Sequence, residues 1–181
     1  MAFTQGVTVV LQCVCLAVSH ASPAVPGQCA DRGQVPDHLR PQSCALVSAL
    51  VSGLSRSSEL RHLAARIEVL NGMVFIEPGT LVQSAENRVL MGALLHRTSI
   101  VGGRRAAFIV VRPDRGDDTV ITLAHEFQHV IEVLQSGAST ESEIDALFAR
   151  IGAEVGANIM ETNEAVLAGR RVAQELARSR R

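Results

Sequence analysis

Two histidines and a glutamate have the spacing of a group that holds a metal ion and activates water. His125, Glu126 and His129 occur in the order His-Glu-Phe-Gln-His. On a helix, residues four positions apart lie on one face a turn apart, so both imidazoles can reach one Zn²⁺ ion. The Glu126 side chain points about 100° further round the helix, where it can reach a metal-activated water without being a ligand. The spacing therefore predicts hydrolysis with Glu126 as the general base.

The helix that would carry this group is predicted over Thr119–Gln135. At about 100° per residue, His129 falls close to His125, and the large apolar residues fall on the opposite face. Such a helix packs one face on the domain and turns the other toward a site. The alternative is a pair of surface histidines, but the residue frequencies of this chain produce the motif by chance in about one per cent of sequences. The apolar residues of the opposite face are Val120, Leu123, Ala124, Phe127, Ile131 and Leu134.

A third protein ligand is expected among the glutamates of the C-terminal part. A long helix is predicted over Ala157–Arg178, and Glu161 lies in the middle of its small and apolar face. A carboxylate in a buried face is costly unless it meets a cation, and Zn²⁺ would supply one. We therefore expect Glu161 as the third ligand, with Glu164 and Glu154 as alternatives. The competing role for Glu161 is that of a capping box with Asn158 at the start of the helix.

Glu132 lies on the same predicted face as the two histidines, two turns beyond His125. On a straight helix it is about 10 Å from His125 along the axis, which is too far to share a metal ion. We expect Glu132 to orient a ligand or to pair with an arginine, and a surface role is the alternative.

The segment TLAHEFQHVIEVL resembles the active-site helix of the zincin metallopeptidases. His129 is followed by neither the glycine nor the third histidine of the metzincin branch, and a single later glutamate ligand would make the chain similar to the gluzincin branch. The chain also resembles small bacterial HExxH proteins through its HEFQHVIEV and METNEA segments. The resemblance covers Met73 to Leu176. It implies a minimal zincin-like fold, one zinc ion and the cleavage of peptide bonds.

The resemblance also bears on the remaining site residues. Asn163-Glu164-Ala165 looks like the Asn-Glu-Ala of thermolysin-like gluzincins, which implies Glu164 as a ligand, although those proteins carry an aspartate where this chain has Ala168. Some gluzincins stabilise the oxyanion with a tyrosine or a histidine. This chain has no tyrosine, so the resemblance makes His96 a candidate for that role, and a surface residue without a role in the site is the alternative. His62, Arg97 and Arg104 are the other candidates.

The predicted function is that of a zinc-dependent metallopeptidase acting on a peptide or protein substrate. By resemblance, the segment RAAFIVVR would be the strand next to the site, to which a substrate could add as a further strand. A zinc-binding protein that does not turn over substrate and serves as a binding module is the alternative, and hydrolysis of a non-peptide amide is a third possibility. The intact Glu126 argues against the binding module, because a purely structural zinc does not need that carboxylate.

The elements around these residues predict an α+β domain. Helical spacing over 44–70, with Ser57 or Ser58 as the cap of a second helix, is followed by strand signals over 73–112. Gly102-Gly103 is typical of a hairpin turn. Beyond residue 119 the pattern is helical, with a capping box at Thr140 and Glu143. We expect a small antiparallel or mixed sheet that carries the HExxH active-site helix and C-terminal helices.

The N-terminal part is predicted to contain a leader and an arm. Val7–Val18 is apolar but too short to span a bilayer, and Ser19 and Ala21 fit a cleavage site, so residues 1–21 are expected to be a signal peptide. This segment has no Lys or Arg before the apolar run, and a misassigned start or a buried strand is the alternative. Residues 22–43 would form an extended arm and residues 44–181 the zincin-like metallopeptidase domain. The mature chain would be secreted or periplasmic, without stable membrane insertion.

Cysteine usage agrees with export. Cleavage after Ala21 would remove Cys13 and Cys15 and leave Cys29 and Cys44. In an oxidising compartment this pair could form a disulfide, and two unpaired thiols are the alternative.

Composition excludes several other functions. The chain has 181 residues, of which 47% are hydrophobic and 19% charged, so it can bury a core. Its formal net charge of −1 argues against a nucleic-acid partner. The chain contains no lysine, which excludes both a P-loop lysine and Schiff-base chemistry.

Overall fold

The computed structural model describes residues 29–79, 81–83, 88–113, 115–156 and 159–180. The predicted signal peptide and the first part of the predicted arm lie outside these residues. In chain order the elements are a 3-10 helix η1 (Arg32–Gln34), β1 (Leu39–Pro41), α1 (Cys44–Arg56), α2 (Ser58–Val69), β2 (Gly72–Pro78), β3 (Leu81–Gln83), β4 (Arg88–Leu90), β5 (Gly92–Val101), β6 (Arg104–Val111), α3 (Asp117–Ser136), α4 (Glu141–Ile151), β7 (Ala153–Gly156), β8 (Ile159–Glu161) and α5 (Asn163–Arg178).

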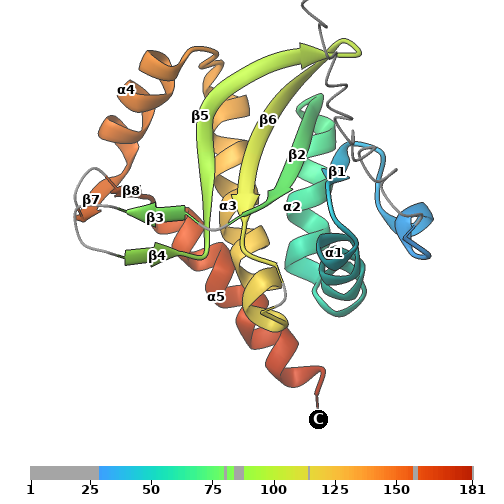
Figure 1. Ribbon diagram of the computed structural model, residues 1–181. Coiled ribbons are helices and arrows are strands. Elements are labelled where there is room, and N and C mark those ends of the chain that lie inside the picture. The colour runs from blue at the N-terminus through green and yellow to red at the C-terminus, as the bar shows by residue number, and fades with distance from the viewer. Residues whose placement is uncertain (1–28, 80, 84–87, 114, 157–158, 181) are drawn as a thin grey trace, which may run out of the picture.

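A four-stranded mixed sheet in the order β1-β2-β6-β5 forms one layer of the fold (Figure 1). β1, β2 and β6 run parallel, and β5 runs antiparallel to β6. The turn between β5 and β6 lies at Gly102 and Gly103, whose φ angles of 57° and 76° suit glycine, so the predicted hairpin is confirmed. Two short two-stranded sheets, β3-β4 and β7-β8, complete the strands of the described residues.

The second layer is helical. α2 and α3 cover one face of the sheet, and α1 and α5 pack against α3 (Figure 1). The apolar stripe of α3 is buried in this core, as its periodicity predicts. These layers confirm the predicted α+β fold with a small mixed sheet. The largest fully buried side chains include Phe127, Leu46, Leu50, Leu60, Leu63, Ile67, Ile76, Ile109, Leu123 and Ile131.

Helix starts follow the predicted caps. Ser57 caps α2 by accepting a hydrogen bond from the Leu60 amide, 3.0 Å away. Thr140 and Glu143 form the predicted capping box at the start of α4. Both caps satisfy amides that have no partner within the helix.

The C-terminal helix is shorter than predicted. The predicted helix over Ala157–Arg178 is confirmed from Asn163 onward and is wrong for Ile159–Glu161, which form β8 and pair with β7. Residues 157 and 158 lie outside the described residues. The Thr162 hydroxyl accepts a hydrogen bond of 3.2 Å from the Ala165 amide and sets this boundary. Glu161 is therefore the last residue of a strand, and the capping-box alternative for it does not apply.

The predicted arm contributes more to the fold than its composition suggests. Its residues Leu39–Pro41 form β1 at one edge of the sheet, and both His38 and Leu39 are buried. Cys29 and Cys44 form a disulfide with their Cα atoms 5.3 Å apart, which joins this segment to the start of α1. Among the described residues, no helix is long and apolar enough to cross a membrane.

Candidate metal centre

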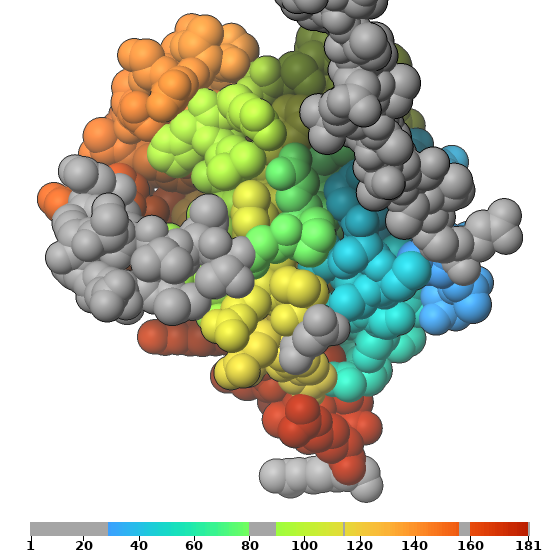
Figure 2. All heavy atoms as spheres, viewed as in Figure 1, coloured from blue at the N-terminus to red at the C-terminus, as the bar shows by residue number. Residues whose placement is uncertain are grey.

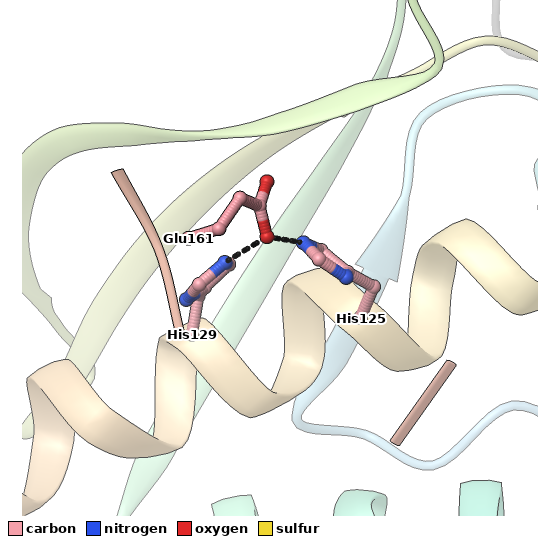
Figure 3. Close-up of side chains that lie close together, drawn as sticks. All are labelled: His125, His129 and Glu161. Carbon is pink, nitrogen blue, oxygen red and sulfur yellow. Dashed lines mark ion pairs between the residues drawn. The ribbon is translucent and has the colours of Figure 1, made fainter. Parts of the chain in front are cut away.

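His125, His129 and Glu161 converge on one point at the surface of α3 (Figure 3). The Oε2 atom of Glu161 lies 3.0 Å from His125 Nε2 and 3.8 Å from His129 Nε2. The two imidazoles come from successive turns of α3, with ring centroids 4.8 Å apart, and the carboxylate comes from the end of β8. One potential ligand atom from each of the three residues lies within 4.8 Å of the others.

The donor set fits a zinc ion. Ligand atoms about 2.0–2.2 Å from zinc in a tetrahedron lie about 3.3–3.6 Å from one another, and the two distances to Glu161 Oε2 bracket this range. That oxygen is buried, yet no group of the described residues donates a hydrogen bond to it. A buried polar atom without a hydrogen bond is costly unless another partner, such as a metal ion, compensates it. Two imidazoles and one carboxylate also leave a fourth position for water, as in catalytic zinc sites.

His129 and Glu161 each shift the pKa of the other. Burial by itself would lower the pKa of His129, but the neighbouring carboxylates of Glu132 and Glu161 outweigh it and raise that pKa to about 9. Burial would raise the pKa of Glu161, but His125 and His129 outweigh it and lower that pKa to about 2. The cluster therefore attracts positive charge, and a metal ion would compete with the proton on His129.

Glu132 orients the second histidine. Its Oε2 atom lies 3.0 Å from His129 Nδ1, which leaves Nε2 of that ring facing Glu161. Its Oε1 atom accepts hydrogen bonds from the Thr162 hydroxyl at 2.8 Å and from Gln128 Nε2 at 3.3 Å. Of the roles expected for Glu132, the structure places it beside the candidate ligand His129 rather than beside an arginine.

Glu126 lies next to His125, His129 and Glu161, which together are called the ligand group below. It is 4% exposed. Burial raises the pKa of its carboxyl group, although His129 and His125 oppose the shift, and the Leu94 backbone amide donates a hydrogen bond to it. Gly92 allows β5 to come this close, because a Cβ atom there would lie 3.1 Å from Glu126 Oε1 and 2.5 Å from Thr122 Cγ2. The general-base candidate is thus held between α3 and the start of β5.

His96 lines a cavity of about 200 Å³ that is also lined by His125, His129, Glu161 and Glu126. Its Nδ1 atom lies 2.5 Å from Asp145 Oδ1 of α4, and its ring stacks on Phe148 with centroids 5.5 Å apart. Phe148 in turn meets the His129 ring edge-on at 5.2 Å. α4 and β5 are side by side at the surface (Figure 2), and together they fix the His96 side chain.

The other predicted candidates lie elsewhere. Glu154 is on β7 and Glu164 in the first turn of α5; both are exposed, and neither belongs to the ligand group. Arg97 lies over the Phe108 ring at 4.6 Å and pairs with Glu77. Neither His62 on α2 nor Arg104 at the start of β6 lines the cavity of the ligand group.

The strand beside the site is β5. The prediction that RAAFIVVR lies there is wrong, because this segment forms most of β6, which is flanked by β2 and β5. β5 is the edge strand at the other end of the sheet from β1, and its residues Gly92, Ala93, Leu94 and His96 line the cavity. Its sequence has few turn signals to separate it from β4, so the apolar run alone did not reveal which strand ends the sheet.

Sequence reasoning also missed the residues that support the site. Asp145, Phe148 and Thr162 reach it only through the packing of α4 and α5, and no local spacing links them to the histidines. Gly92 at the start of a strand is a signal of close backbone approach that could have been used.

Comparisons with models of protein families, with curated proteins and with solved structures return no match for this chain.

Proposed function

We propose that this chain is a zinc-dependent peptidase of the zincin type. The observation that carries the proposal is the convergence of His125 Nε2 and His129 Nε2 on Glu161 Oε2, with Glu126 buried beside them. The Glu126 carboxylate is not needed for a structural metal site, but its position suits a general base.

The residues have distinct roles in the proposed reaction. A zinc ion held by His125, His129 and Glu161 would polarise the scissile carbonyl and activate a water molecule for attack. Glu126 would accept the proton of that water and pass it to the leaving amine. As an imidazolium, whose Nδ1 donates to Asp145, His96 would donate a second hydrogen bond from Nε2 to the oxygen that gains negative charge.

The edge of β5 supports a peptide as the substrate. Among the described residues β5 pairs with β6 on one side only, and its other side faces the cavity of the ligand group. An extended peptide can add to such an edge through main-chain hydrogen bonds, which would draw its carbonyl groups past Glu126. Gly92 has no side chain and Ala93 has only a methyl group, so both residues leave room for this approach.

We also propose that the protein works outside the cytosol. The Cys29–Cys44 disulfide supports this, because such bonds persist in oxidising compartments.

Zinc content and peptide cleavage together test the proposal. Wild-type protein should bind about one zinc ion and cleave members of a peptide library. Glu126→Gln should keep the zinc and lose cleavage by about 10²–10⁴-fold, whereas the exposed control Glu164→Gln should match the wild type. A folded protein that takes up no zinc when zinc is supplied would overturn the proposal. Zinc uptake without peptide cleavage would contradict the peptidase and favour a binding module, or a non-peptide amidase if only small amides are hydrolysed.

A further inference from the structure

A second cavity adjoins the metal centre on the side of α5. Its volume is about 370 Å³, and it shares Leu90, Gly92, His125, Glu126 and Glu161 with the cavity that contains His96. The two cavities therefore meet at His125, Glu161 and the general-base candidate Glu126, and one reaches Phe148 of α4 while the other reaches α5. A substrate whose reacting bond lies over the shared residues has room for a group on each side.

The walls of this second cavity are mainly apolar. α3 and α5 pack against each other there, and a Cβ atom at Gly169 would lie in ordinary contact, 3.6 Å from Ile121 Cγ2. A volume of about 370 Å³ falls within the range of pockets that bind small ligands, about 300–1,000 Å³. The apolar or small lining residues are Leu90, Met91, Gly92, Ile121, Val166, Gly169 and Ala173.

The lining of this cavity includes one arginine, Arg170. Arg170 of α5 lines it, is exposed and forms no ion pair within the described part of the chain. Its neighbour Arg171 differs, since it points to α2 and lies 3.1 Å from Glu59. With a divalent metal ion on Glu161, the charges around the cavity sum to a positive value, because Glu126 and Glu161 carry two negative charges against the metal ion and Arg170. The cavity would thus favour an anionic group and disfavour a cationic one.

We propose that this α5-side cavity is a specificity pocket for a substrate residue that flanks the cleaved bond. It takes a side chain with an apolar stem and a carboxylate end, namely glutamate, and Arg170 selects it over lysine. The apolar walls hold the methylene groups, and the guanidinium at the rim meets the carboxylate. This inference rests on the proposed peptidase function and names its substrate class.

The test compares matched peptides that differ only at the residues flanking the cleaved bond. Zinc-loaded wild type should cleave the glutamate peptide about tenfold faster, as kcat/KM, than the lysine peptide. Arg170→Gln should reduce this ratio to about twofold or less, and Arg170→Glu should invert it. Arg171→Gln, which removes an adjacent arginine that does not line the cavity, should leave the ratio unchanged.

A binding measurement provides a second readout. In Glu126→Gln protein, which should bind without cleaving, the same two peptides should show the same order of affinity by fluorescence anisotropy, and adding Arg170→Gln should abolish it. Equal rates of cleavage for the glutamate and lysine peptides would contradict the proposed specificity pocket. A ratio that Arg170→Gln does not change would contradict it as well. Neither result would contradict the proposed peptidase function. The absence of any peptide cleavage by wild type would overturn both.

Discussion

The Thr162 hydroxyl donates a hydrogen bond of 2.8 Å to Oε1 of Glu132, and this bond links the two elements that carry the ligand group. Thr162 directly follows Glu161, and Glu132 lies on the helix of His125 and His129. The other oxygen of Glu132 lies 3.0 Å from His129 Nδ1. The Glu132 carboxylate therefore contacts both His129 and Thr162, the residue that follows Glu161.

Removal of this carboxylate should weaken metal binding. In Glu132→Ala, His129 loses the partner of its Nδ1 atom and Thr162 loses its acceptor, so we expect zinc affinity to fall by about 10–100-fold. Competition with a chromogenic chelator measures the change. Glu164→Ala is the matched control, because Glu164 lines the same polar pocket as Glu132 and Thr162 but is exposed. An unchanged affinity in Glu132→Ala would remove Glu132 from the site.

Replacement of His96 should affect turnover rather than zinc content. His96→Ala removes a side chain that lines the cavity and is held by Asp145, so we expect kcat to fall by about 10²–10³-fold with zinc retained. Asp145→Asn should give a smaller loss, because it affects only the orientation of the ring. His62→Ala on α2 controls for the loss of a histidine elsewhere. Wild-type turnover by His96→Ala would contradict the assigned role.

Acid should remove the stabilising effect of Glu175. This carboxylate accepts hydrogen bonds from the Ser57 and Ser58 hydroxyls and from the Glu59 amide, which ties α5 to the start of α2. Burial would raise its pKa, but these hydrogen bonds lower it below the usual 4.5. On acidification the unfolded chain therefore takes up this proton first, so the stabilisation is complete above pH 4.5 and is lost as the pH falls through the lowered folded-state pKa.

Urea unfolding of Glu175→Gln and wild type at a series of pH values measures this effect. At neutral pH the variant should be less stable by about 1 kcal/mol, and the difference should shrink below pH 4.5. A difference that stays constant into acid would show that the charge of Glu175 does not contribute.

Reduction of the disulfide should destabilise the fold. Cys29 and Cys44 are 15 residues apart, and closing a loop of this length stabilises a protein by about 3 kcal/mol. Urea unfolding with and without dithiothreitol should show a loss of this size in the wild type and no effect of the reductant on Cys29→Ser. Equal stability of the oxidised and reduced wild type would contradict the prediction.

Local signals predicted much of the fold, and non-local pairing accounts for the rest. The stripe of α3, the cap of α2 at Ser57 and the Gly102-Gly103 hairpin depend on neighbours in sequence, and all three are confirmed. The parallel pairing of β1 with β2 depends on residues far apart in the chain. A three-residue strand has too few side chains to show a period.

The candidate site also combines features set by neighbours in sequence with features set by residues far apart in the chain. The spacing of His125 and His129 is a property of one helix and could be found from sequence. Glu161 was selected on the face of a helix that does not extend to it, and it lies beside the histidines because β8 brings it there. The β7-β8 hairpin has short strands and an irregular register, so nothing in its pattern separated it from the start of α5.

The position of Glu161 near the end of the chain has a consequence for synthesis. During translation from the N-terminus, both histidines leave the ribosome well before the carboxylate, with the whole of α4 between them. Of the three candidate ligands, a nascent chain that stops at α4 would contain only the two imidazoles, and it would lack the α5 wall of the proposed specificity pocket. A premature stop there would thus yield a protein that still contains the HExxH motif but has an incomplete ligand set.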